Sequence, residues 1–214
     1  MRKLFIVLLV FLVAGCGPGV EAEPESDSAA EADDLYQSAV AADEAGKFGD
    51  SEELLAQIVA EHSSSTAADD AGEMLARVRE SSEAAALEAV RDIIEAQDYY
   101  MATQRRYGLN VEDLVGQILL PEDPSRAGLG YRFSLRGSPS ADSYTLTAEP
   151  SSGVGEKRSF FADSSGVIRS ELGQPATVES PELDADSDLS SLWAEDPCAL
   201  RVTTAWGHLR RCHS

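Results

Sequence analysis

The stretch GYRFSLRG, residues 130–137, decides the fold, because its apolar side chains recur at every second position. This period of two is typical of a β-strand that buries one face. The stretch SYTLTAEP, residues 143–150, repeats the pattern. We therefore expect two paired strands whose buried faces carry the alternating residues Tyr131, Phe133, Leu135, Tyr144, Leu146 and Ala148.

Two further strands are expected at residues 158–162 and 167–170, on either side of Asp163-Ser164-Ser165-Gly166. A tetrapeptide with Asp first and Gly last is typical of a tight turn. Upstream of the strands, a helix is expected to end near Gly108, with an apolar stripe of Leu87, Val90, Ile93, Ile94, Tyr100 and Met101. The glycine-rich and proline-rich residues 109–130 are expected to form a loop.

Residues 32–62 predict an antiparallel helix pair that is interrupted at Gly46 and Gly49. Asp50 and Glu53 have the spacing of a capping box at the start of the second helix. A third helix is expected over residues 67–81. The predicted fold class is therefore α+β, with a helical hairpin segment (34–83) followed by one helix packed on a four-stranded antiparallel sheet (84–172).

The hairpin segment resembles a tetratricopeptide repeat. Ala39 and Ser51 stand at the small-residue positions of that motif, and Gly46-Lys47-Phe48 matches its turn. The resemblance implies that Leu35 packs in the first helix and that Leu55 and Ile58 form the inner face of the second. The segment covers only about one and a half repeats, so a plain alanine-rich hairpin remains an alternative.

The second segment resembles the globular half of type IV pilins and type II secretion pseudopilins. The residues that carry this resemblance are AVRDIIEAQDYYMATQRRYG (89–108), GYRFSL (130–135), YTLTAEP (144–150) and RSFFADSSGVIR (158–169). Pilins of this family assemble through a long hydrophobic N-terminal helix, whereas this chain has acidic helices in that place. The resemblance thus implies a pilin-like head that is displayed rather than built into a filament core.

The first residues form a secretory signal. Arg2 and Lys3 precede an apolar run over residues 4–13, which is too short to span a bilayer as a helix. A plain cleavable signal is one interpretation. Val13-Ala14-Gly15-Cys16 also resembles the lipobox of bacterial lipoproteins, which implies cleavage after residues 1–15 and acylation of Cys16, including by palmitate.

The lipobox resemblance also implies a cellular location. Gly17 occupies the position at which inner-membrane retention would place Asp, so the outer membrane, facing the periplasm, is the expected location. Residues 16–33 are expected to form an acidic flexible tether.

The composition and motifs limit the classes of partner and ligand that we expect. The net charge is −21, which disfavours binding to nucleic acid. Neither a phosphate-binding loop nor a Gly-x-Ser-x-Gly elbow occurs, and the sequence points to no cofactor and no small-molecule substrate. His62 is expected to end a helix, where its charge suits the helix dipole. Tyr99, Tyr100 and Tyr107 are interpreted as packing residues rather than as a binding stripe.

The tail, residues 173–214, is interpreted as an acidic linker with a disulfide between Cys198 and Cys212. Two alternatives remain. His208 and His213 could join the cysteines in a metal site. The other alternative is a calcium loop, which lacks the usual Gly at Leu189 and would use Asp184, Asp186, Asp188, Ser190 and Glu195.

These patterns favour a non-catalytic protein-interaction or assembly scaffold, anchored to the cell envelope by lipid and binding other envelope proteins. One alternative is an accessory pilin-like component of a type IV pilus or type II secretion system. Another is a calcium-binding surface protein.

Overall fold

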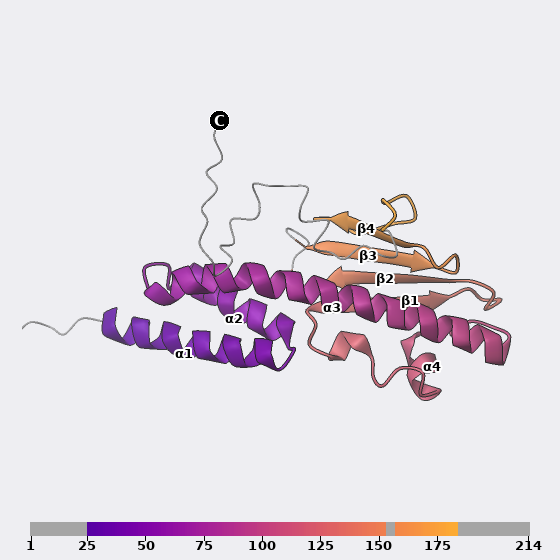
Figure 1. The fold of residues 1–214 in the computed structure, drawn as a ribbon, viewed down its shortest axis with the longest axis horizontal. Coiled ribbons are helices and arrows are strands. Elements are labelled where there is room, and N and C mark those ends of the chain that lie inside the picture. Colours follow the sequence, from indigo (N-terminus) through magenta and orange to yellow (C-terminus); the bar gives the residue numbers. More distant parts are fainter. Residues whose placement is uncertain (1–24, 153–156, 184–214) are drawn as a thin grey trace, which may run out of the picture.

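The computed structural model describes residues 25–152 and 157–183. The fold is mixed helix and sheet, with a four-stranded antiparallel sheet, which confirms the predicted α+β class (Figure 1). The elements are α1 (Glu25–Glu44), α2 (Phe48–Glu61), α3 (Thr66–Gln104), α4 (Val111–Gly116), the 3-10 turn η1 (Pro124–Arg126), β1 (Tyr131–Gly137), β2 (Tyr144–Pro150), β3 (Arg158–Asp163) and β4 (Ile168–Leu172).

The sheet is a simple meander in the order β1-β2-β3-β4. Phe133 pairs with Ala148, which in turn pairs with Phe160, so one face carries an aromatic row with a small residue at its centre. The expected turn before β4 is present. Gly166 has φ +76°, and its N–H donates to the carbonyl oxygen of Asp163 at 3.0 Å.

The helix α3 is continuous over 39 residues, whereas the sequence led us to expect one helix over residues 67–81 and a separate one from residue 84. The predicted boundary between the segments thus lies within α3. The first half of this helix packs against α1 and α2, and the second half covers one face of the sheet (Figure 1). One helix therefore serves as the backbone of both segments.

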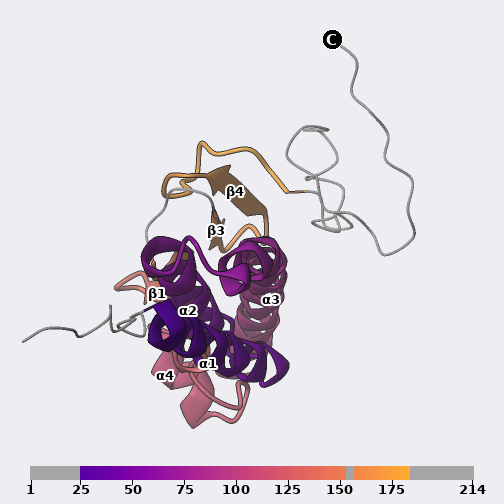
Figure 2. The same cartoon turned by 90° about the vertical axis from the view of Figure 1, so that its left-hand side faces the viewer.

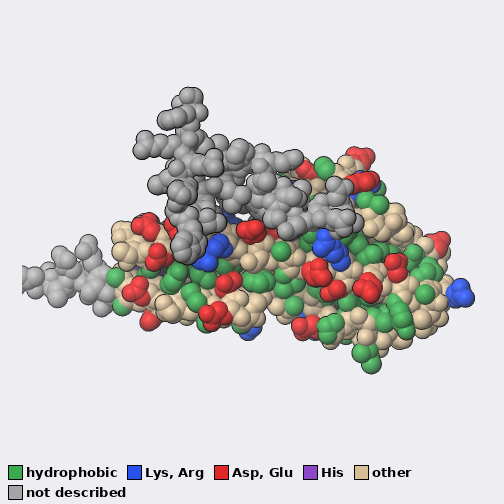
Figure 3. Space-filling model, in the orientation of Figure 1, with side chains coloured by type: hydrophobic (Ala, Val, Ile, Leu, Met, Phe, Trp, Pro, Cys, Tyr) green, Lys and Arg blue, Asp and Glu red, His purple; other side chains and the backbone are tan. Residues whose placement is uncertain are grey.

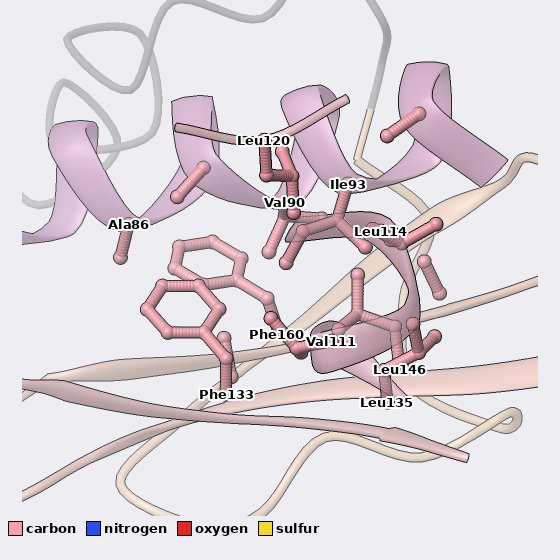
Figure 4. Close-up of a cluster of buried hydrophobic side chains, with 14 of the residues drawn as sticks. Ala86, Val90, Ile93, Val111, Leu114, Leu120, Phe133, Leu135, Leu146 and Phe160 are labelled. Atoms are coloured by element: carbon pink, nitrogen blue, oxygen red, sulfur yellow. The ribbon is translucent and has the colours of Figure 1, made fainter. Parts of the chain in front are cut away.

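Two separate groups of buried side chains form the core. The larger group lies between the second half of α3, the sheet and α4; it includes Ala86, Val90, Ile93, Leu114, Phe133, Leu146 and Phe160 (Figure 4). Gln97 is also fully buried here. Its side-chain Oε1 accepts the N–H of Gly108 at 2.8 Å, and its Nε2 donates to the carbonyl oxygen of Gly108 at 3.1 Å. This pair of bonds holds the chain beneath α3 as it leaves the helix.

The smaller group lies between α1, α2 and the first half of α3, which Figure 2 shows side by side. Small residues let α1 and α2 approach closely. Ala39 and Ser51 are fully buried, and the Ser51 hydroxyl donates to the carbonyl oxygen of Ala39 at 2.9 Å. Leu55 and Ile58 are also fully buried in this group.

Several helix ends differ from the sequence-based expectation. The helix α1 begins at Glu25, within the expected flexible tether. Ala32 is fully buried, so packing offsets the entropy cost of ordering these residues. The N-cap of α2 is Lys47 rather than Asp50, which lies in the first turn. The expected capping box is therefore not formed.

The C-terminal end of α3 also differs. The helix ends at Gln104, and Arg105 takes the left-handed conformation with φ +58°. Gly108, which we expected to stop the helix, is instead the residue held by Gln97. The expected loop before β1 contains α4, whose N-cap Asn110 accepts the N–H of Asp113 at 2.9 Å.

The hairpin meets the loop before β1 through glycines. The Gly49 N–H donates to the carbonyl oxygen of Gly128 at 2.9 Å. A Cβ atom on Gly49 would lie 2.8 Å from the Cα of Gly130. Two backbones therefore touch at this point, and no side chain fits between them.

Substitution Gly49→Ala is expected to lower the free energy of unfolding by about 1–3 kcal/mol, because the added methyl group forces these backbones apart. The matched control is Gly72→Ala on the exposed face of α3, where an added Cβ meets nothing within 4 Å. That change is expected to stabilise the protein by about 0.5–1 kcal/mol. Urea denaturation of both variants measures the difference. Equal stability of the two variants would contradict the close contact.

Candidate functional site

A buried ion pair connects the hairpin to the sheet. Glu52 on α2 accepts a hydrogen bond from Nζ of Lys157, just before β3, at 2.5 Å. The side chains are 7% and 2% exposed, respectively. Nε of Arg79 on α3 donates to the other oxygen of Glu52 at 3.2 Å. Glu52 thus links three elements through two cations.

A second carboxylate lies beside this pair. Glu83 on α3 is fully buried, and its Oε1 accepts the backbone N–H of Arg158 at 3.0 Å. The hydroxyl of Tyr131 donates to the carbonyl oxygen of Arg158 at 2.8 Å. Nζ of Lys157 lies 5.2 Å from the centre of the Tyr131 ring, within range of a cation–π contact. The start of β3 is therefore fixed from α2, α3 and β1.

Next to these groups a pocket of about 860 Å³ lies between the hairpin and the sheet. We call it the junction pocket. Its lining combines the charged groups above with backbone of the glycine-rich loop and with exposed positions on α2. The lining residues are Gly49, Asp50, Glu52, Glu53, Ala56, Arg79, Ser125, Gly128, Gly130, Tyr131, Ser151, Ser152 and Lys157.

The junction pocket combines charged and neutral polar groups. Its volume is in the range of small-ligand sites. Asp50 and Glu53 supply negative charge at its wall, while Arg79 and Lys157 are engaged by Glu52. Exposed backbone and serine side chains add donors and acceptors. On the face shown in Figure 3, the described surface carries many acidic and few basic side chains.

Burial controls the electrostatics of Glu83. Removal from water raises the pKa of this carboxyl from 4.5 to about 7, against the opposing effect of the Arg158 N–H bond and the Arg158 and Lys157 charges. Among the described residues, Oε2 of Glu83 has no hydrogen-bond partner, which fits a carboxyl that holds a proton near neutrality. Burial, with the nearby charges of Glu83 and Glu52, also raises the pKa of Tyr131.

Most of the residues singled out from the sequence cannot be placed relative to this site, because they fall outside residues 25–152 and 157–183. Cys16, Cys198 and Cys212 lie outside the described residues, as do His208, His213 and the acidic positions 184–195. His62 is the C-cap of α2, as its position suggested, and its Nδ1 lies 3.1 Å from the Ser28 hydroxyl.

Two of the three tyrosines singled out above pack as predicted. Tyr100 is buried, and Tyr107 makes an edge contact with Tyr144 at 5.0 Å between ring centres. Tyr99 is 58% exposed, so its interpretation as a packing residue was wrong.

The junction residues were missed, although the sequence carried a sign of two of them. Glu83 lies four and seven positions before Leu87 and Val90, on the same helical face. Glu52 likewise precedes the apolar Leu55 by three positions. A carboxylate on an apolar face indicates a buried partner. The pattern does not reveal that the partner is Lys157.

Comparison of the chain with protein-family models, with curated proteins and with solved structures finds no match. Within residues 25–152 and 157–183, no group of three or more His, Cys, Asp or Glu side chains is arranged to hold a metal ion. No helix in the described part of the chain has both the length and the apolar character needed to cross a bilayer.

The raised pKa of Glu83 predicts a pH-dependent stability. Between pH 4.5 and about 7 the folded protein keeps a proton on Glu83 that the unfolded chain releases, so stability falls as pH rises through this window. The free energy of unfolding of the wild-type protein should fall by on the order of 2–3 kcal/mol between pH 5 and pH 7.5 because of this group. In Glu83→Gln, which has no carboxyl at this position, that decrease should be absent.

Urea denaturation at pH 5 and pH 7.5 measures this difference. Glu73→Gln, on the exposed face of the same helix, is the control and should keep the wild-type dependence. Parallel profiles for wild type and Glu83→Gln would show that Glu83 titrates normally.

Proposed function

We propose that this protein is a lipid-anchored, non-catalytic scaffold of the cell envelope, which binds a polar segment of a partner protein in the junction pocket. The observation that carries the proposal is the pocket itself, about 860 Å³ in volume. It lies between two modules, the helical hairpin of α1 and α2 and the sheet of β1 to β4, which a buried ion pair connects. A pocket supported by a continuous helix and by fixed charges offers a preorganised surface, which lowers the entropy cost of binding.

The position of α1 supports display from a membrane. The start of α1 at Glu25 and the sheet lie at opposite ends of the long axis (Figure 1). Cys16 precedes α1 by only nine residues. Acylation there would hold the helical end near the bilayer and direct the sheet away from it.

We propose that the hairpin is of tetratricopeptide type. The close approach of Ala39 and Ser51, joined by a hydrogen bond of 2.9 Å, supports this assignment. However, Leu55 and Ile58 are buried against other helices and do not line an open groove. For this reason we assign partner binding to the junction pocket rather than to a groove between the helices.

We propose that the second half of α3 and the sheet form a pilin-like head. A helix packed across a four-stranded meander supports this assignment. The hairpin covers the first half of α3, burying Ala71, Met74 and Val78. Pilins use the corresponding part of their helix for assembly. Because the hairpin covers this part of α3, we favour a pilin-like head that is displayed at the envelope rather than built into a filament core. An accessory role beside a pilus or secretion filament remains the alternative.

The anchor can be tested directly. When the chain is expressed with its signal in a Gram-negative bacterium, labelled palmitate is expected to enter the wild-type protein but not Cys16→Ala. The wild-type protein should fractionate with outer membranes. An unlabelled wild-type protein released in soluble form would show that the signal is a plain cleavable one.

Partner binding can be tested by filling the junction pocket. Ala56 lines the pocket from the exposed face of α2, so Ala56→Arg blocks it without changing the core. Ala60→Arg places the same side chain on the same helix outside the pocket and is the matched control. After cross-linking in intact envelopes, proteins captured by wild type and Ala60→Arg should be lost with Ala56→Arg, by tenfold or more.

Several outcomes distinguish the proposals. Unchanged capture by Ala56→Arg would exclude the junction pocket as the binding site. Capture no greater than that of Cys16→Ala would count against an envelope partner. Recovery of pilins or of pilus assembly proteins would favour the accessory role.

A further inference from the structure

A second groove, of about 580 Å³, lies between α3 and the start of β4. We call it the α3–β4 groove. Its apolar part is formed by Ile94, Val167, Ile168 and Leu183, and its rim by Arg91, Glu95, Asp98 and Glu182. The Leu183 N–H donates to the carbonyl oxygen of Ile168 at 2.8 Å. The last described residues therefore form one wall of the groove.

The rim of the groove carries three carboxylates and one guanidinium group. Glu182 is paired with Arg169 at 2.8 Å, and Arg91 with Glu88 at 3.5 Å. No ion pair is found for Glu95 or Asp98 among the described residues, and Asp92 lies next to them on the helix. Burial raises the pKa of Asp92, and the nearby charges of Glu88 and Glu95 raise it further, so these carboxylates lie close together beside the groove. A suitable occupant of the groove is apolar and positively charged.

The chain contains a segment with this chemistry. Residues 197–214 have three arginines, Arg201, Arg210 and Arg211, and no Asp or Glu, in a protein of net charge −21. The same segment supplies the apolar residues Leu200, Val202, Trp206 and Leu209. Its charge and its apolar content both complement the groove.

The segment starts close to the groove along the chain. Only residues 184–196 separate it from Leu183, and these thirteen residues can span up to about 45 Å. A linker of this length gives a local concentration on the order of millimolar, which favours binding within one molecule over binding between molecules.

We propose that residues 197–214 dock into the α3–β4 groove of their own chain. Trp206 contacts the apolar side chains of the groove, and the arginines lie beside Glu95 and Asp98. A disulfide between Cys198 and Cys212 would close the segment into a loop and lower the entropy cost of docking. The docking does not depend on the lipid anchor or on the junction pocket.

The tryptophans make this docking measurable in the full chain. The protein has two tryptophans, Trp193 and Trp206, and both follow Leu183 in the sequence. In the Trp193→Phe background, fluorescence reports on Trp206 alone. Docking predicts a blue-shifted emission and protection from iodide and acrylamide quenching.

The test reverses the charge of the groove. Glu95→Lys/Asp98→Lys should shift the docking equilibrium about tenfold toward the undocked state, with a red shift and faster quenching. Asp70→Lys/Glu73→Lys changes the net charge equally, at the same spacing on the exposed face of α3, and should leave Trp206 protected. Adding Arg210→Glu/Arg211→Glu to the groove variant should restore protection.

Thermal melts followed by far-UV circular dichroism verify that each variant is folded. Identical quenching of Trp206 in the groove variant and in the control variant would overturn the proposal. Any protection of Trp206 would then come from a source other than the groove, such as detergent. Protection that appears only as protein concentration rises would also overturn it, since the segment would then bind a second copy.

Discussion

The relation between the two modules depends on the ion pair of Glu52 and Lys157, residues that are 105 positions apart in the chain. The two apolar groups of the core are separate, so no shared hydrophobic layer sets the angle between hairpin and sheet. Taking two charges out of water is costly, and a buried pair adds little net stability unless further hydrogen bonds support it. Arg79 supplies that support. The pair therefore acts on orientation, together with the continuous helix α3 and the hydrogen bond between Gly49 and Gly128.

The continuity of α3 can be understood from its buried face. Ala67, Ala71, Met74, Val78, Ser82, Ala86, Ala89, Ile93, Ala96 and Tyr100 are all buried, at spacings of three or four. This stripe passes through Ser82 without a break. The boundary expected between residues 83 and 84 falls within this stripe. However, the Ser82 hydroxyl donates to the carbonyl oxygen of Leu129 at 2.7 Å, so this position is a contact and not a helix end.

The sheet was predictable because each strand shows its period of two locally and the Asp163–Gly166 turn is short. Helix ends were less predictable, because tertiary packing decides them. The burial of Ala32 stabilises α1 within the stretch that we expected to be a flexible tether. Gly108 does not end α3, because the Gln97 side chain binds its backbone N–H and carbonyl groups. The junction was predictable only in part. Its carboxylates lie three or four positions from apolar residues of the same helices, but the cation that pairs with Glu52, Lys157, comes from just before a distant strand.

The arrangement also limits how the protein can assemble with others. The first half of α3 carries an apolar stripe that α1 and α2 cover. For this half of the helix to pack in a filament, the hairpin would have to leave it and separate Glu52 from Lys157. Breaking such a pair leaves a buried charge without its partner, at a cost of about 3–5 kcal/mol. Assembly through surfaces that are already exposed has no such cost. The junction pocket is already open in the described part of the chain, so a partner proposed to bind there would not incur this cost.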